Sequence, residues 1–189
     1  MEERLLKQLD SLQQIVYTFN YADDTTGLND FESFESKLAE IASLAQKEKV
    51  FEPVFRVNNI LFNHFKYQLY RERALNVLDE TIVLARELND TLKVARFIYL
   101  KGTLSFRFDD LDSSVYYFQK ARNMGREIGN VPLEASAINA LAVCYAQLNR
   151  DNEAIKYYKE SMALAEEINA KSQVTMAQLN LGNAYGRLN

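Results

Sequence analysis

Apolar residues recur every three or four positions along almost the whole chain. In one such run, Ile155, Tyr158, Met162 and Ala165 follow one another at this spacing. Residues spaced in this way share one face of an α-helix, whereas a half-buried strand alternates apolar and polar residues at every second position. No segment shows that alternation convincingly. The pattern therefore predicts an all-α chain.

Short polar segments divide the apolar runs into about nine predicted helices. The expected helices span residues 3–19, 31–47, 53–68, 72–88, 92–108, 112–128, 132–148, 152–168 and 172–188. Asp90, Asp110, Asn130 and Asp151 lie close to four of these starts. Their short polar side chains can accept hydrogen bonds from first-turn N–H groups, so we expect them to be N-caps.

The predicted helices repeat with a period of 40 residues. Glu87, Glu127 and Glu167 are separated by this interval, and several other positions keep it. These are Leu88, Ile128 and Ile168; Ala74, Ser114 and Ala154; Leu78, Phe118 and Tyr158; and Gly102, Ala142 and Gly182. Each period holds two helices, and a pair of helices cannot bury its apolar face alone. The units are therefore expected to stack into a solenoid.

The segment AINALAVCYAQLNRDNEAIKYYKESMALAEEI, residues 137–168, resembles the tetratricopeptide repeat. A leucine, a small residue and a tyrosine match the first helix of that repeat, and a small–large–small pattern matches the second. The matching residues are Leu141, Ala142 and Tyr145, then Ala154, Tyr158 and Ser161, and again Leu181, Gly182 and Tyr185. Two positions depart from the pattern, since Phe62 replaces a small residue and Lys101 replaces a leucine. We expect Lys101 to extend its ammonium group to water.

The resemblance implies a right-handed α-solenoid of antiparallel helix pairs in a single domain over residues 1–189. The expected units span about 3–50, 51–90, 91–130 and 131–170, with a half unit at 171–189. Because the last unit would lack its second helix, we expect the chain to be a fragment of a longer protein. The open apolar face of helix 172–188 could then pair with the same face of a second copy in a homodimer.

Composition narrows the classes of partner. The net charge is −4 and no Lys/Arg-rich run occurs, so neither nucleic acid nor an anionic membrane surface is expected as a partner. No stretch approaches the ~18 apolar residues of a membrane span. A single cysteine, Cys144, fits a reducing compartment, so we expect a cytoplasmic protein. A periplasmic or extracellular domain of a truncated protein stays an alternative.

Little in the sequence points to catalysis. His64 is the only histidine and lies in a predicted mid-helix segment among aromatic residues, and Cys144 lies in an apolar helix. Both are interpreted as packing residues. No phosphate-binding, zinc or calcium motif occurs, so we expect neither an enzyme nor a cofactor or metal. In residues 20–30, Asp23, Asp24, Thr25 and Asp30 could form a cation site. Their spacing is not that of a known calcium loop and favours a solvated loop before a helix capped by Asn29 or Asp30.

In the family that the chain resembles, first helices line a concave groove that binds peptides or protein segments. The groove positions carried over to this chain are Arg56, Asn59, Asn63 and Lys66; Arg96, Tyr99, Thr103 and Arg107; Asn139, Val143 and Gln147; and Asn180, Asn183 and Arg187. Asparagine can both donate and accept hydrogen bonds to a peptide backbone, and arginine can hold a carboxylate. The alternative is that these are ordinary exposed positions.

Two functional hypotheses follow. In the first, the solenoid is a non-enzymatic module that binds a protein or an extended peptide. Long-period repeats of this kind resemble the sensory arms of bacterial signalling proteins, so the module could be the N-terminal regulatory arm of a larger protein. In the second, the solenoid is an oligomerisation or spacer element without a peptide ligand.

Overall fold

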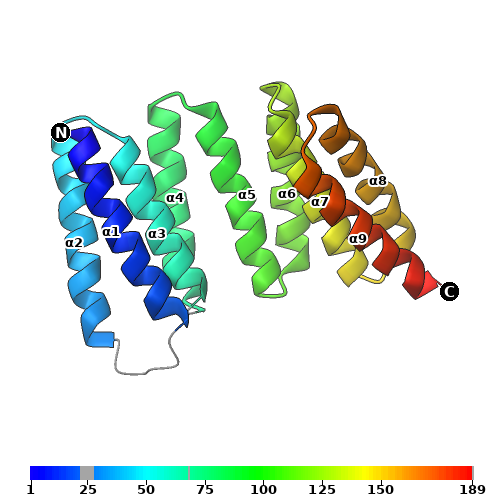
Figure 1. Ribbon diagram of the computed structural model, residues 1–189, viewed down its shortest axis with the longest axis horizontal. Helices are drawn as coiled ribbons and strands as arrows, with labels where there is room; N and C mark the ends of the chain where they lie inside the picture. The colour runs from blue at the N-terminus through cyan, green and yellow to red at the C-terminus, as the bar shows by residue number, and fades with distance from the viewer. Residues whose placement is uncertain (22–27, 68, 189) are drawn as a thin grey trace. The chain divides into compact units, whose positions relative to one another are not determined.

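The computed structural model describes the backbone of residues 1–21, 28–67 and 69–188, and their side chains except those of residues 12, 14–21 and 28–33. This part of the chain forms nine α-helices and no strand, which confirms the all-α prediction (Figure 1). The helices are α1 (Glu2–Tyr21), α2 (Leu28–Lys47), α3 (Glu52–Tyr67), α4 (Arg71–Glu87), α5 (Thr91–Arg107), α6 (Leu111–Glu127), α7 (Val131–Gln147), α8 (Asp151–Glu167) and α9 (Lys171–Leu188).

Helices α4 to α9 begin at regular intervals. Each starts 20 residues after the one before, at residues 71, 91, 111, 131, 151 and 171. The residue two positions before each start has a positive φ of 54° to 68°, the left-handed conformation that closes the preceding helix. These residues are Leu69, Asn89, Asp109, Gly129, Asn149 and Asn169. The regular spacing of these helices therefore follows from one turn geometry used at each connection from α3 to α9.

Three of the four expected N-caps are confirmed. The side chains of Asp90, Asp110 and Asn130 accept hydrogen bonds from the backbone N–H groups of the third helical residue, at 2.9, 3.2 and 3.0 Å. The prediction for Asp151 is wrong: it is the first residue of α8, and the cap position belongs to Arg150, which makes no side-chain cap bond. The Asp151 carboxylate instead accepts hydrogen bonds from the Arg187 guanidinium on α9.

The expected cap of α2 is also wrong. The helix begins at Leu28, so residues 29 and 30 lie inside it rather than before it. Residues 22–27 lie outside the described part of the chain, as do the side chains of residues 28–33. The cation-site alternative considered for Asp23, Asp24, Thr25 and Asp30 therefore falls on residues that the structure does not describe.

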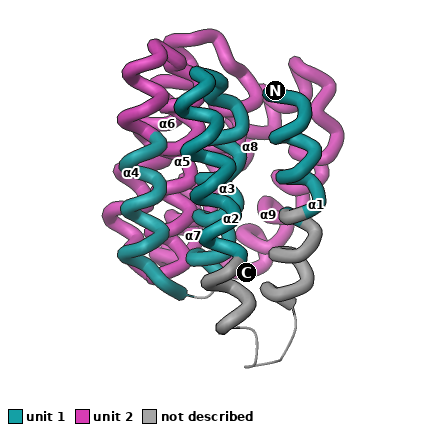
Figure 2. The backbone as a smooth tube through the Cα atoms, turned by 90° about the vertical axis from the view of Figure 1, so that its left-hand side faces the viewer, with its two compact units in different colours: residues 1–81 teal, residues 82–189 magenta. Residues whose placement is uncertain are grey.

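The chain divides into two compact units, residues 1–81 and 82–189 (Figure 2). In the first unit, α3 packs against both α1 and α2. The Arg56 guanidinium donates to the Asp10 carboxylate at 2.6 Å and links α3 to α1. A hydrogen bond of 2.8 Å from the Asn58 amide to the Thr81 hydroxyl links α3 to α4. Fully buried side chains such as Leu5, Leu38 and Phe62 belong to the core of this unit.

In the second unit, α5 to α9 pack in chain order, each against the next. Helix α7 also contacts α5 and α9, so the first helices of consecutive repeats lie beside one another. Two clusters of buried residues fill the unit. One holds Phe118, Leu141 and Cys144, and the other holds Ala142, Ala154, Ile155, Tyr158, Leu181 and Ala184.

Small residues set the distance between paired helices. A Cβ atom placed on Gly102 would lie 2.7 Å from the Phe118 ring, so α5 and α6 could not approach as closely with a larger residue. The Ser114 hydroxyl donates to the Gly102 carbonyl at 3.0 Å, which holds the same contact from the other side. Lys101 beside it is half-buried, and its ammonium group lies 5.1 Å from the centre of the Tyr117 ring.

Glycine at equivalent positions of two repeats provides a test of this packing. Gly102→Ala should lower the free energy of unfolding by about 1–3 kcal/mol, because the new methyl group overlaps the Phe118 ring. Gly182→Ala should instead raise it by up to about 1 kcal/mol, since nothing lies within 4 Å of the added Cβ and alanine favours the helix. Urea denaturation of both variants measures the difference. Equal changes of either sign would contradict the proposed role of Gly102.

Candidate functional site

In the first unit, the predicted groove residues of α3 share one face of the helix. Arg56, Asn59, Asn63 and Lys66 are separated by three, four and three residues. The Asn63 amide donates to the Asn59 carbonyl at 2.9 Å, and the Lys66 ammonium donates to the Asn63 side-chain oxygen at 3.3 Å. Arg56 also donates to the Gln13 amide oxygen, at 3.1 Å. The structure therefore brings these four residues together, with the Arg56 charge already matched by Asp10.

In the second unit, α5 supplies two exposed arginines and a mostly buried tyrosine. Arg96 and Arg107 are exposed near opposite ends of the helix, and Thr103 between them is half-buried. The Tyr99 ring packs 5.2 Å from the Phe118 ring, and burial raises the pKa of its hydroxyl. Tyr99 thus contributes mainly to the core, and the two arginines are the groups on α5 that a ligand can reach.

Helix α7 supplies half-buried polar groups. The Gln173 amide of α9 donates to the Ser136 hydroxyl of α7 at 3.0 Å and joins the two helices. Beside this bond, the side-chain oxygens of Asn139 and Gln173 are buried without a hydrogen-bond partner among the described residues. Buried acceptors without partners are uncommon, and these two lie below the surface that a ligand can reach. Val143 and Gln147 continue the same helix face.

Helix α9 departs from the expected surface. Asn183 is exposed, but Asn180 is half-buried and occupies the position equivalent to Ala140 rather than to Asn139. Arg187, named as a groove residue, donates to Asp151 from both its Nε and Nη2 atoms, at 2.9 and 2.5 Å, so its charge is matched within the fold.

Two residues of this surface were missed by the sequence reasoning. Met176 occupies the position of Arg96 and Ser136, and Leu179 that of Tyr99 and Asn139; their side chains are 57% and 65% exposed. The 40-residue spacing was enough to find both, because it places them in register with residues that were named.

Charge is distributed unequally between the two kinds of helix in the second unit. Helices α5, α7 and α9 contain six Lys or Arg residues and one acidic residue, Glu134. Helices α6 and α8 contain five basic and seven acidic residues. Glu134 is buried and its carboxylate accepts from the Arg126 Nε atom at 2.7 Å, so it offers no free negative charge. The first helices therefore form the basic side of an acidic chain.

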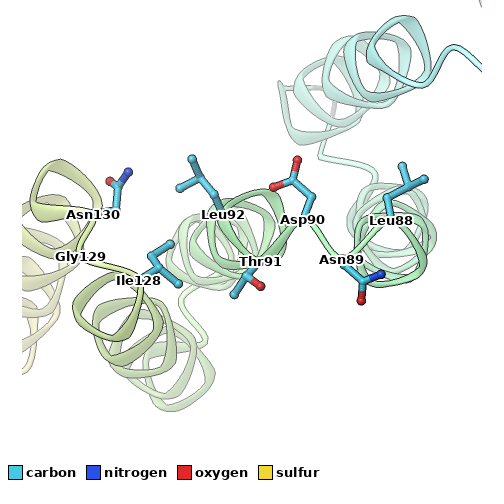
Figure 3. Close-up of a pocket in the computed structure, with 8 residues that line it drawn as sticks. All are labelled: Leu88, Asn89, Asp90, Thr91, Leu92, Ile128, Gly129 and Asn130. Atoms are coloured by element: carbon cyan, nitrogen blue, oxygen red, sulfur yellow. The ribbon is translucent and has the colours of Figure 1, made fainter.

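A shallow hollow of about 550 Å³ lies elsewhere in this unit, at its turns (Figure 3). It is lined by Leu88, Asn89, Asp90, Thr91 and Leu92 and by Ile128, Gly129 and Asn130. The side chains of Asp90 and Asn130 are engaged as helix caps, and the Lys93 ammonium donates to Asp90 at 2.8 Å. The hollow contains none of the predicted groove residues, and two of its polar side chains, Asp90 and Asn130, are used within the fold.

Comparison with known families agrees with this geometry. Residues 93–167 match the sequence model of the tetratricopeptide repeat. This part of the chain consists of tetratricopeptide repeats. No curated protein matches the chain.

The fold of the chain is an α-solenoid, and solved structures resemble it over almost the whole chain. One is a signal transduction ATPase with numerous domains and a tetratricopeptide repeat sensor, from Pyrococcus horikoshii, with a TM-score of 0.73 and 17% identity over 96% of this chain. BtubC from P. vanneervenii gives 0.71 and 19% over 81%. A Rap protein complexed with competence and sporulation factor gives 0.70 and 15% over 98%. The matches cover 27%, 65% and 59% of those chains, respectively.

The tetratricopeptide fold is typically non-catalytic, and the two residues considered for catalysis are buried. Burial lowers the pKa of His64 to about 4, with the nearby Arg73 charge adding to the effect, so the imidazole is neutral at neutral pH. Cys144 is fully buried beside the Ser114 hydroxyl, and burial raises the pKa of its thiol. No cluster of three His, Cys, Asp or Glu residues that could hold a metal occurs within the described residues.

The helices that the structure describes include none that is long and apolar enough to cross a membrane.

The buried histidine predicts a pH dependence of stability. Below pH 6.5 the unfolded chain takes up a proton at His64, whereas the folded chain does so only near pH 4. The free energy of unfolding should therefore fall with decreasing pH in this window, by up to about 1.4 kcal/mol per pH unit from this residue. Because His64 is the only histidine, urea denaturation of the original chain and of His64→Gln isolates its effect. Parallel pH profiles would show that His64 titrates normally in the folded protein.

Proposed function

We propose that the second unit of this protein-interaction repeat domain binds an extended, acidic segment of a partner protein on the face formed by α5, α7 and α9. The observation that carries the proposal is the charge distribution on these helices. They hold six basic residues, of which Lys93 and Arg187 are paired with Asp90 and Asp151, and one neutralised acidic residue. A basic surface on a chain of net charge −4 attracts a partner of opposite charge.

The side chains on this face suit an extended backbone as well as a carboxylate. Arg96 and Arg107 are exposed and can hold carboxylates through paired hydrogen bonds. Asn139, Asn180 and Asn183 can each donate to a peptide carbonyl and accept from a peptide N–H group. The α3 row of Arg56, Asn59, Asn63 and Lys66 is proposed as a separate contact surface within the first unit.

We further propose that the module is non-enzymatic and acts as the regulatory arm of a larger signalling protein. Support comes from two proteins of similar fold, one described as having a tetratricopeptide repeat sensor and one crystallised with competence and sporulation factor. The identities of 17% and 15% relate these proteins by fold only. The regulatory role is therefore proposed for this chain by analogy with these two proteins.

A displayed library of random 12-residue peptides tests the binding face. Selection on the immobilised chain should enrich acidic sequences, and the selected peptides should bind Arg96→Ala about 5- to 100-fold more weakly in fluorescence anisotropy, the effect of losing a hydrogen bond to a charged group. Lys156→Ala is the matched control, because Lys156 is exposed on α8 and should leave binding unchanged. Binding should also weaken with added salt. Equal binding by the Arg96 and Lys156 variants would reject the proposed face.

A second candidate function, homodimerisation through α9, is favoured by one observation. Gly182 and Gly186 have nothing within 4 Å of an added Cβ, and Tyr185 between them is 44% exposed. The equivalent glycine on α5 receives the Phe118 ring of α6. On α9 the space beside Gly182 and Gly186, here called the notch, is open. The same face of a second copy could fill it in a two-fold arrangement.

Sedimentation velocity tests this candidate. If α9 forms the interface, Gly182→Glu should fill the notch and convert the dimer to a monomer. Asn183→Glu introduces the same residue on another face of the same helix and should leave the dimer intact. A monomer in the unaltered chain at high micromolar concentration would exclude dimerisation as the function of this face.

A further inference from the structure

The proposed binding face is not uniform from one repeat to the next. At one position the first helices carry Arg96, Ser136 and Met176, in the order α5, α7 and α9. The exposed charge is thus on α5, a hydroxyl is on α7, and an exposed thioether chain is on α9. The neighbouring position ends on α9 with Leu179, which has the largest exposed fraction among the exposed large apolar side chains of the described residues.

The fold does not require apolar residues at these positions of α9. Helix α7 packs between two neighbours with Ser136 and Asn139 in the same places, and α5 packs with Arg96. The residues that attach α9 to α8 and α7 are Ala177, Leu181 and Ala184, which lie on a different side of the helix. Met176 in particular serves no packing need of α9, and the exposure of its side chain costs free energy in water.

The positive charge of the face is higher at α5 than at α9. The exposed Arg96 keeps α5 basic, whereas on α9 Asp151 matches the charge of Arg187. A ligand that crosses the face therefore passes from a basic surface to an apolar one. The same face of a second copy would bring further basic residues to Arg96 rather than acidic ones, because neither α5 nor α9 contains an acidic residue.

We propose that the partner segment is graded in the same way, with acidic residues over α5 and bulky apolar residues over Met176 and Leu179. This inference rests on the proposed function of the face. Packed helices lie about 8–10 Å apart, and α7 contacts both α5 and α9, so the two ends of the face are separated by about 16–20 Å. An extended segment advances about 3.3 Å per residue, which places its acidic and apolar residues about five or six positions apart.

Selection of the random 12-residue peptide library on three immobilised chains tests the gradient. The chains are the unaltered protein, Met176→Ser, which installs the α7 residue, and Tyr116→Ser, which removes an apolar side chain that is 59% exposed on α6. The unaltered and Tyr116→Ser chains should enrich peptides with acidic and large apolar residues about five or six positions apart. The Met176→Ser chain should enrich acidic peptides without the apolar component.

A peptide from the first selection provides the quantitative test. It should bind Met176→Ser about tenfold more weakly than the unaltered chain, the effect of losing one buried apolar contact. A shortened peptide that keeps only the acidic half should bind both chains equally. Enrichment of acidic sequences alone, with no effect of Met176→Ser, would overturn the graded partner while leaving the proposed function intact. Failure to enrich acidic sequences would overturn both.

Discussion

The left-handed turn between helices is the constraint on which the rest of the structure depends. Each connection from α4 onward places one residue at a positive φ and starts the next helix two positions later. The backbone closes the turn with the same bond each time, for example from the Asp90 N–H to the Ala85 carbonyl at 2.9 Å and from the Asn130 N–H to the Gly125 carbonyl at 2.8 Å. Because these turns are equivalent, α4 to α8 all have 17 residues and the repeats stay in register.

Because the repeats stay in register, each pair of helices must only match the sizes of the side chains that face each other between them. Gly102 faces the Phe118 ring in one repeat, and Ala142 and Tyr158 share a cluster in the next. In the first unit both positions hold a residue of different size. The large, fully buried Phe62 stands at the position of Gly102, and the smaller Leu78 stands at the position of Phe118. A large residue on one helix is thus matched by a smaller one on its partner, which explains how the chain tolerates Phe62 in place of a small residue. Cores accept such exchanges when the total volume is conserved.

The sequence predicted the helices and three caps because those features depend on residues close together in the chain. Asp90 and its cap bond span three residues, and Asn89 before it suits the left-handed turn. The left-handed turns also repeat every 20 residues, half of the 40-residue period, at Asn89, Asp109, Gly129, Asn149 and Asn169. The side-chain partners of the candidate site could not be predicted in this way. Arg56 pairs with Asp10, which is 46 residues away, and Arg187 pairs with Asp151, which is 36 away.

The same separation of local and distant effects explains where specificity can reside. Positions that face the turn or the paired helix are constrained by backbone geometry and volume, so most repeats keep the same kind of residue there. Leu141 and Leu181 illustrate this, and Lys101 is the departure at the same position. Positions such as Arg96, Ser136 and Met176 are free of both constraints and differ in charge and polarity at every repeat. An array of equivalent helices therefore has surface positions at a regular spacing, and the side chain at each of them can change without affecting the fold. A binding partner that crosses several repeats contacts these variable side chains one after another. The fold determines their spacing, and their chemistry determines which partner binds.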